Sequence, residues 1–389
     1  MKFDYMLCNP PFGVEWKKYE KEVRKKHEKK GFGGRFGAGL PRINDGSLLF
    51  LQHMVSKMQI ANGGSRIAIV LNGSPLFTGD AGSGESNIRK WIIENDMLEA
   101  IIGLPNDMFY NTGILTYVWV VTNRKEKHRK GKVQLINAVT FFEKMRKSLG
   151  NKRNFITDSQ IDDITKAYHN FKENEYCKIF DNDDFGYWRI TVERPLRLNF
   201  QASKECIESL REQKAFQNIA KSKKKGKAGQ KEIEEGQKLQ EEIITRLSSM
   251  DGKVYKNREA FLDKINQQFN DNGTKLFSPI MKAIINVLSE KDESADICTD
   301  TKGNPEPDSD LRDNENIPLK DDIQKYFESE VKPYVPKAWI DEKKTKIGYE
   351  IPFTRHFYVY QELRPLDVIN KEIQELEQEI QDMLQKVTE

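Results

Sequence analysis

Four consecutive residues, Asn9, Pro10, Pro11 and Phe12, combine groups that could hold a planar substrate bearing an amino group. They follow an apolar run at residues 3–8 that is typical of a buried strand. Proline has no N–H to donate to a neighbouring strand, so two successive prolines end the strand. In open α/β sheets, ligands bind at the carboxyl ends of the strands. The sequence therefore predicts a ligand-binding turn at residues 9–12, which we call the NPPF turn.

The chemistry that this turn suits is group transfer to an exocyclic amine. The lone pair of such an amine is delocalised into its ring, so the nitrogen is a poor nucleophile. The Asn9 amide oxygen and the Pro10 main-chain carbonyl could each accept one amine N–H, and the fixed φ of proline would hold the carbonyls in place. Phe12 could stack on a base rotated out of a duplex. The alternative is a strand-ending turn that binds nothing, because Asn-Pro and Pro-Pro are common turn dipeptides.

Sequence blocks beyond the turn resemble a known family. The chain is similar to the methyltransferase (modification) subunit of type I restriction-modification systems, an N-6 adenine-specific DNA methylase. The resemblance is strongest at residues 100–114 and 118–125, and it covers most of the chain apart from roughly 201–315. The other blocks that carry it are residues 47–53, 66–73, 88–96, 146–153, 185–187, 192–196 and 348–358.

This resemblance implies a site-specific DNA methyltransferase that moves a methyl group from S-adenosyl-L-methionine to adenine N6 in double-stranded DNA. Asn9, Pro10, Pro11 and Phe12 would be its catalytic residues. It also implies a bacterial or archaeal cytoplasmic protein that works with a DNA-specificity subunit and, in a complete system, with a restriction subunit. The alternative function is that of an inactive remnant that retains only the contact with a partner subunit.

The position of the NPPF turn departs from the family pattern. In the family, a helical N-terminal domain and a glycine-rich cofactor loop precede this motif, whereas here it begins at residue 9. We therefore expect an N-terminally truncated chain in which S-adenosyl-L-methionine is bound mainly by absent residues. The glycine-rich stretches at residues 31–39 and 79–85 do not replace the loop, because the first follows a lysine-rich segment and the second has the wrong spacing. No cofactor-binding residue is assigned in this chain.

Strand and helix patterns alternate up to residue 125 and predict a mostly parallel α/β sheet, with an antiparallel pair at residues 98–102 and 116–122 on its edge. With the resemblance, the fold class is a partial S-adenosylmethionine-dependent methyltransferase (Rossmann-like) sheet with a C-terminal helical extension. The first strand would form a bare sheet edge, which favours self-association. The expected parts are 1–200 (C-terminal part of the catalytic domain), 201–316 (charged helical insertion or linker, partly disordered) and 317–389 (C-terminal region ending in a coiled-coil-like helix).

The overall composition excludes only a few classes of function. Of the 389 residues 32% are charged, but the net charge of +3 is too small to indicate nucleic-acid binding by itself. Four widely separated cysteines lack zinc-site or disulfide spacing, so no metal is expected. The chain has no run of about 18 apolar residues, so no membrane span is expected. His53 and His356 are expected to be structural rather than catalytic.

A local cluster of positive charge follows the predicted sheet. It could track a phosphate backbone, and a solvated loop is an equally weighted alternative. The family resemblance favours a face near DNA. A second lysine-rich run, at residues 221–227, is more typical of a solvated helix or flexible insertion. We call the first group the basic cluster: Lys144, Arg146, Lys147, Lys152 and Arg153.

The C-terminal residues carry an apolar heptad pattern. Apolar positions recur in steps of four and three over nearly three heptads, as in a coiled coil. The alternative is a helix that packs on its own domain. In the family, a C-terminal helix docks on the DNA-specificity subunit, so the resemblance favours a partner surface. We call these residues the heptad seam: Ile369, Ile373, Leu376, Ile380, Met383 and Val387.

Overall fold

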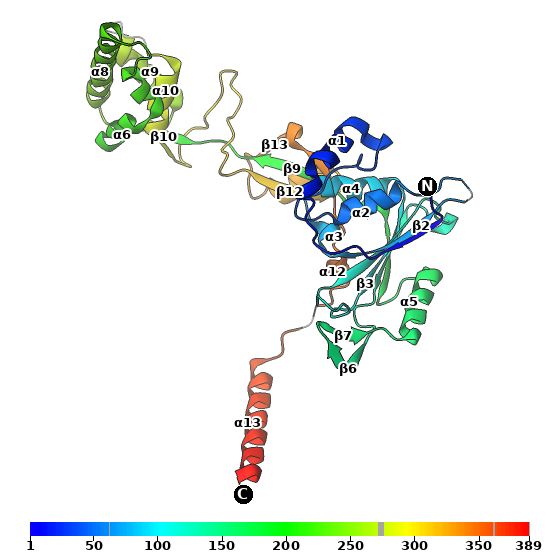
Figure 1. Ribbon diagram of the computed structural model, residues 1–389. Coiled ribbons are helices and arrows are strands. Elements are labelled where there is room, and N and C mark those ends of the chain that lie inside the picture. Colours follow the sequence, from blue (N-terminus) through cyan, green and yellow to red (C-terminus); the bar gives the residue numbers. More distant parts are fainter. Residues whose placement is uncertain (62, 271–275, 361, 389) are drawn as a thin grey trace. The chain divides into compact units, whose positions relative to one another are not determined.

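The computed structural model describes residues 1–389 apart from 62, 271–275, 361 and 389, and without the side chains of residues 270 and 385–388. The chain divides into two compact units: unit 1 is Met1–Gly186 with Gly348–Glu389, and unit 2 is Tyr187–Ile347. These boundaries differ from the expected ones at residues 200 and 316. Unit 1 is a mixed α/β unit, whereas unit 2 combines a small sheet with a helical part (Figure 1). None of the described helices is long and apolar enough to cross a membrane.

Unit 1 is built on a six-stranded mixed sheet. Strands β1, β2, β3 and β5 run in one direction, and β4 and β8 run in the other. The carboxyl ends of the parallel strands therefore lie together, at what we call the carboxyl end of the sheet. The strand order is β1 (Tyr5–Cys8), β2 (Arg66–Asn72), β4 (Thr116–Thr122), β3 (Leu98–Leu104), β5 (Lys132–Asn137) and β8 (Cys177–Asp181).

Apolar side chains recur along these strands and form a buried core. Ile67 and Ile69 of β2 and Trp119 and Val121 of β4 are fully buried. The predicted α/β sheet is confirmed, and so is the antiparallel pairing of β3 with β4. The expected edge position of that pair is wrong, because β5 and β8 extend the sheet beyond β3.

Strand β1 lies at the edge of the sheet. It pairs with β2 from Tyr5 to Cys8, and no other described strand pairs with it. The side chain of Leu7 is 85% exposed. The ring of Tyr5 is contacted by the guanidinium of Arg124, which lies 4.6 Å from the ring centre. The bare edge that the sequence predicts is therefore present, and self-association through it stays a prediction.

Helices and a C-terminal return segment, residues 348–358, pack around the sheet. The return segment bonds to α3 through Ile351 N–H and Leu76 O, 2.9 Å apart, and its Phe353 ring contacts that of Tyr117. These contacts attach the return segment to the helices and the sheet of unit 1. The helices are α1 (Glu20–Lys30), α2 (Ser47–Val55), α3 (Ser74–Phe77), α4 (Gly84–Glu94), α5 (Asp158–Asn170) and α12 (Phe353–His356).

A fully buried arginine on α4 joins the return segment to the loop after α3. The guanidinium of Arg89 donates to the main-chain carbonyls of Tyr349, Pro75, Thr78 and Gly79. Carbonyl acceptors satisfy the buried donors, since an unpaired buried charge would be strongly destabilising. Arg89 thus holds together segments that lie some 260 residues apart in the chain.

Unit 2 contains a small antiparallel sheet and a helical part with its own apolar core. Buried aromatic and aliphatic side chains, including Phe216, Phe261 and Ile284, form that core. The strands are β9 (Gly186–Glu193), β12 (Asp313–Pro318) and β13 (Trp339–Ile340), and a separate pair is β10 (Leu198–Phe200) with β11 (Ser289–Lys291). The helices are α6 (Lys204–Ser209), α7 (Lys214–Gln217), α8 (Lys227–Ser248), α9 (Arg258–Asn270), α10 (Ser278–Val287) and α11 (Ile323–Tyr326).

Residues 289–316 differ from the disordered linker that their composition suggests. They contribute β11 and most of β12, and isolated bridges join Arg197 to Ile297 and Thr299 to Pro305. Their acidic residues build turns: an oxygen of Asp300 accepts from the N–H groups of Lys302 and Asn304. Strand β14 (Lys346–Tyr349) then leads back to unit 1, and α13 (Leu366–Thr388) follows.

Candidate active site

The NPPF turn lies at the carboxyl end of the sheet, directly after β1. Asn9 and Pro11 are exposed, Pro10 is buried and Phe12 is half-buried. Among the described residues, neither the Asn9 amide nor the Pro10 carbonyl has a hydrogen-bond partner. The turn therefore presents two free acceptors, as its proposed role with an amine requires.

Contacts just after the turn hold it in place. Val14 O accepts from Gly46 N–H at 2.9 Å, and Trp16 N–H donates to Ile43 O at 3.0 Å. The indole of Trp16 is buried, and its N–H donates to Arg42 O at 2.9 Å. The chain at Val14 and Trp16, just after the turn, is thus fixed to the loop that precedes α2.

The loop between β3 and β4 brings a second aromatic ring to the turn. The rings of Phe12 and Phe109 lie 5.5 Å apart, edge to face, with an interplanar angle of 83°. The loop is compact, because Asp107 N–H donates to Gly113 O and Phe109 bridges to Thr112. Sequence reasoning did not single out Phe109, although it lies in the block of strongest family resemblance and closely follows a strand that ends at this side of the sheet.

Two buried polar side chains lie at the same end of the sheet. Asn72 of β2 is paired in register with Thr116 of β4. The Asn72 Oδ1 and Thr116 Oγ1 atoms are buried and have no hydrogen-bond partner in the described part of the chain. Buried polar atoms are usually paired, so these two have bonding capacity for a water molecule or a ligand group. Sequence reasoning did not single out this pair.

The basic cluster lies on a β-hairpin beside the β3–β4 loop. Its two strands are β6 (Glu143–Leu149) and β7 (Lys152–Phe155), which pair antiparallel (Figure 1). Almost all residues of β6 are exposed. The structure therefore brings the predicted basic residues to the same end of unit 1 as the NPPF turn.

The N-6 DNA Methylase family model matches residues 1–187. This part of the chain, slightly under half of its length, is similar to the N-6 DNA methylase family. The match covers the whole sheet, the NPPF turn and the hairpin, and it ends at the boundary of unit 1. We call residues 1–187 the methylase segment.

Relatives of the methylase segment are type I methylase subunits. The chain is 28% identical over 224 residues to the type I restriction enzyme MjaVII methylase subunit of Methanocaldococcus jannaschii, covering 57% of this chain and 37% of that protein. It is 32% identical over 167 residues to the HindI methylase subunit of Haemophilus influenzae, covering 42% and 32%. The chain thus spans about a third of the length of these curated relatives.

A solved structure of a type I restriction-modification methyltransferase subunit from Streptococcus thermophilus is 27% identical, with a TM-score of 0.39. That match covers 47% of this chain and 35% of the other. The family resemblance seen in the sequence is confirmed by the family match and the curated relatives.

The glycine-rich stretches of the methylase segment do not fit S-adenosyl-L-methionine. Residues 31–33 continue α1, so no strand precedes them. A side-chain carbon at Gly84, where α4 begins, would lie 1.7 Å from Leu40 O, so backbone already occupies that helix end. The nearby carboxylate of Glu85 accepts from Arg42 N–H at 2.8 Å. Neither stretch offers an open cradle for the cofactor.

His53 of the methylase segment and His356 of the return segment are both partly buried. Burial, followed by the charges of Arg35 and Lys57, lowers the pKa of His53. His356 packs 4.2 Å from the Phe180 ring centre, and burial lowers its pKa. The described residues contain no cluster of His, Cys, Asp and Glu that could hold a metal ion. Neither histidine lies in the NPPF turn or its contacts.

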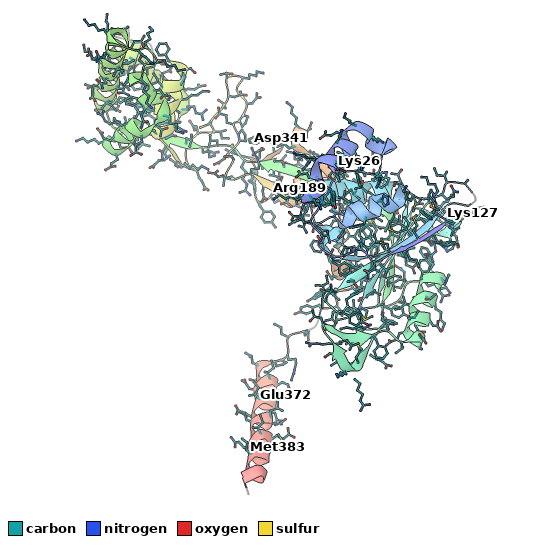
Figure 2. All side chains as sticks on the ribbon, viewed as in Figure 1. Lys26, Lys127, Arg189, Asp341, Glu372 and Met383 are labelled. Atoms are coloured by element: carbon teal, nitrogen blue, oxygen red, sulfur yellow. The ribbon has the colours of Figure 1, made fainter. Side chains whose placement is uncertain are left out.

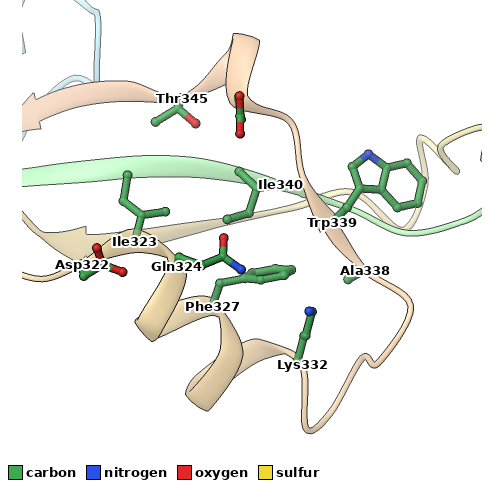
Figure 3. A pocket seen from close by; sticks show the side chains of 10 residues that line it. Asp322, Ile323, Gln324, Phe327, Lys332, Ala338, Trp339, Ile340 and Thr345 are labelled. Carbon is green, nitrogen blue, oxygen red and sulfur yellow. The ribbon is translucent and has the colours of Figure 1, made fainter.

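A separate pocket in unit 2 offers no competing site. It has a volume of about 620 Å³ and is lined partly by Phe327, Trp339 and Ile340 (Figure 3). Two of its polar groups are engaged: Asp322 accepts from Lys325 N–H at the start of α11, and Lys332 pairs with Glu328 at 2.7 Å. The pocket shares no lining residue with the NPPF turn, so it is separate from the candidate site.

The heptad seam lies on α13, and its described side chains are unburied. Met383, labelled in Figure 2, is 56% exposed, and Leu376 and Ile380 are exposed to a similar degree. The side chain of Val387 lies outside the described residues. An apolar stripe of this kind in solvent is available to a partner helix.

Proposed function

We propose that this chain supplies the amine-holding part of a type I DNA adenine N6-methyltransferase. The observation that carries the proposal is the exposed, unpartnered Asn9 amide at the carboxyl end of β1, within a segment of the N-6 DNA methylase family. The curated relatives are named type I restriction enzyme methylase subunits, which supports a role in a site-specific restriction system.

The NPPF turn would act by positioning and electrostatics. Asn9 Oδ1 and the Pro10 carbonyl would accept the two N–H bonds of adenine N6, which favours a more tetrahedral nitrogen and aims its lone pair outward. The fixed φ of Pro10 and Pro11 keeps these acceptors in place without reorganisation. No step requires a nucleophilic side chain of the protein.

The aromatic pair would hold the base. Enzymes that modify a base rotate it out of the duplex and stack it against aromatic side chains. The Phe12 and Phe109 rings meet edge to face, which fixes the orientation of Phe12. The half-buried Phe12 then keeps part of its surface for the base.

The methyl donor in this proposal is S-adenosyl-L-methionine, bound mainly by residues outside this sequence. The misfit of residues 31–39 and 79–85 supports that division. Calorimetric titration of the chain alone with the cofactor should give no measurable heat of binding. Micromolar binding would contradict this division of roles.

The partners in this proposal are double-stranded DNA, a DNA-specificity subunit bound through the heptad seam of α13, and a restriction subunit where the system has one. The exposed apolar residues of α13 support the second of these. A protein with these partners would work in the bacterial or archaeal cytoplasm, where the DNA lies.

Methyl incorporation into DNA tests the role of Asn9. The chain is mixed with the cofactor-binding N-terminal part of a type I methylase, supplied as a separate polypeptide, and with unmethylated DNA and labelled cofactor. Asn9→Ala should lower incorporation by about 10²–10³-fold, because one preorganised acceptor is lost. Phe12→Ala should weaken it less.

The matched control is Asn170→Ala, which removes the same side chain from the exposed end of α5. It should leave incorporation unchanged. Normal methylation by the Asn9→Ala mixture would refute the assignment of the amine-holding role to the NPPF turn.

A further inference from the structure

The β6–β7 hairpin carries positive charge that the rest of the molecule does not neutralise. Among residues 143–155, the only acidic side chain is Glu143. None of the five residues of the basic cluster forms an ion pair with a described residue. The ammonium of Lys152 lies over the Tyr110 ring, 5.3 Å from its centre. A charge cluster without internal partners is free to bind an external anion.

The hairpin is held by the β3–β4 loop rather than by an apolar core. Arg153 and Asn154 N–H groups both donate to Asp107 O, at 2.9 and 3.2 Å, and Asn151 N–H donates to Tyr110 O at 3.0 Å. The Asn154 amide, which is buried, donates to Asn106 O at 3.0 Å. Two-stranded hairpins are marginal alone, so these bonds set the position of this one.

The turn of the hairpin fits closely against the same loop. Gly150 has a φ of +62°, and a side-chain carbon there would lie 2.5 Å from Tyr110 O. Only glycine allows this approach without strain. The loop that holds the hairpin also carries Phe109, whose ring contacts Phe12. The basic cluster is therefore fixed relative to the NPPF turn by a short chain of contacts.

We propose that the β6–β7 hairpin binds the phosphate backbone of duplex DNA next to the base that the NPPF turn holds. This inference rests on the proposed function and adds a contact surface to it. Lysine and arginine contacts to phosphates position a protein on DNA and supply most of its salt-dependent affinity. The exposed strand β6 presents Lys144, Arg146 and Lys147 for such contacts.

The test measures binding of the full chain to a fluorescently labelled duplex by anisotropy over a series of KCl concentrations. The hairpin variant combines Lys144→Gln, Arg146→Gln and Lys147→Gln. Both proteins should bind DNA more weakly as the KCl concentration rises from about 50 to about 200 mM. If the variant lacks three phosphate contacts, the fall in affinity of the wild-type chain should be about 40 times larger than that of the variant. At the lower salt concentration the variant should bind more weakly than the wild-type chain.

The control variant combines Lys127→Gln, Lys130→Gln and Lys166→Gln, so its net charge equals that of the hairpin variant. Lys127 and Lys130 lie before β5, at the opposite end of the sheet, and Lys166 is an exposed residue of α5 (Lys127 is labelled in Figure 2). This variant should keep the wild-type affinity and salt slope.

Equal binding by the hairpin and control variants would overturn the inference and leave the proposed role of Asn9 intact. That role has its own readout, since Asn9→Ala should reduce methylation without changing DNA affinity. A wild-type chain that binds no duplex at about 50 mM KCl would also overturn the inference, whereas the role of Asn9 would still be decided by methylation in the mixture with the N-terminal part.

Discussion

The most constrained side chain in the methylase segment is the guanidinium of Arg89. It is fully buried and donates to four main-chain carbonyls on two separate stretches of chain. Charge-assisted hydrogen bonds of this kind are stronger than neutral ones, and the carbonyls would lack donors without it. Arg89 therefore stabilises the attachment of the return segment.

Replacement of Arg89 should destabilise unit 1. Arg89→Met keeps much of the side-chain volume but leaves the carbonyls unpaired, and we expect a loss of about 3 kcal/mol in the free energy of unfolding. Lys90→Met, at the half-buried neighbouring position of the same helix, should change it by less than about 0.5 kcal/mol. Urea denaturation of both variants gives the comparison, and equal midpoints would show that the carbonyl contacts contribute little.

At the same scale, Asn9 and Phe12 could be predicted because their environment is local. A strand, two prolines and a turn are adjacent in the sequence, so their geometry follows from a few residues. Phe109 could not be predicted, because its contact with Phe12 depends on which strands lie near each other in the sheet. Asn72 and Thr116 were missed for the same reason.

Among the helices and strands, α13 has both a sequence pattern and a surface exposure that indicate a partner helix. Its seam residues are apolar in a heptad pattern, and the described ones remain unburied. Most of the stability of a helix in a protein comes from packing of its apolar face, so a partner on the heptad seam would stabilise α13. The alternative of a helix packed on its own domain finds no support in these exposures.

Charges placed in the heptad seam should block the partner. We expect Ile373→Glu with Ile380→Glu to weaken binding to the specificity subunit of the same restriction system by at least about 100-fold, because two buried apolar side chains are lost. Gln374→Glu with Gln381→Glu adds the same charge one position away from the seam and should bind normally. Calorimetric titration measures both, and equal affinities would exclude the seam as the contact.

The acidic stretch at residues 289–316 shows why composition misleads at the level of elements. A high content of Asp and other polar residues is shared by disordered linkers and by tight turns between strands. Here the carboxylates serve as turn acceptors, as at Asp300, or as partners of a lysine, as Asp308 is for Lys291 at 2.7 Å. A disordered linker and a set of tight turns differ in whether the segment pairs with other strands, and those strands lie far away in the sequence.

For the whole molecule, the α/β sheet of unit 1 could be predicted, but the division into units could not. The chain leaves unit 1 at Gly186 and returns at Gly348. The return depends on contacts such as Tyr349 N–H with Ser86 Oγ at 2.9 Å, which join distant positions. Local periodicity carries no information on such contacts, whereas it does determine strands and helices.

The open side of β1 also bears on how a complete catalytic cavity could be assembled. A further strand laid alongside β1 in the same direction would bring its own last residues next to the Asn9 amide. The added strand would then extend the sheet and form one side of the cavity in the same step. A polypeptide that docked there would become catalytically relevant by the act of folding against Leu7 and its neighbours.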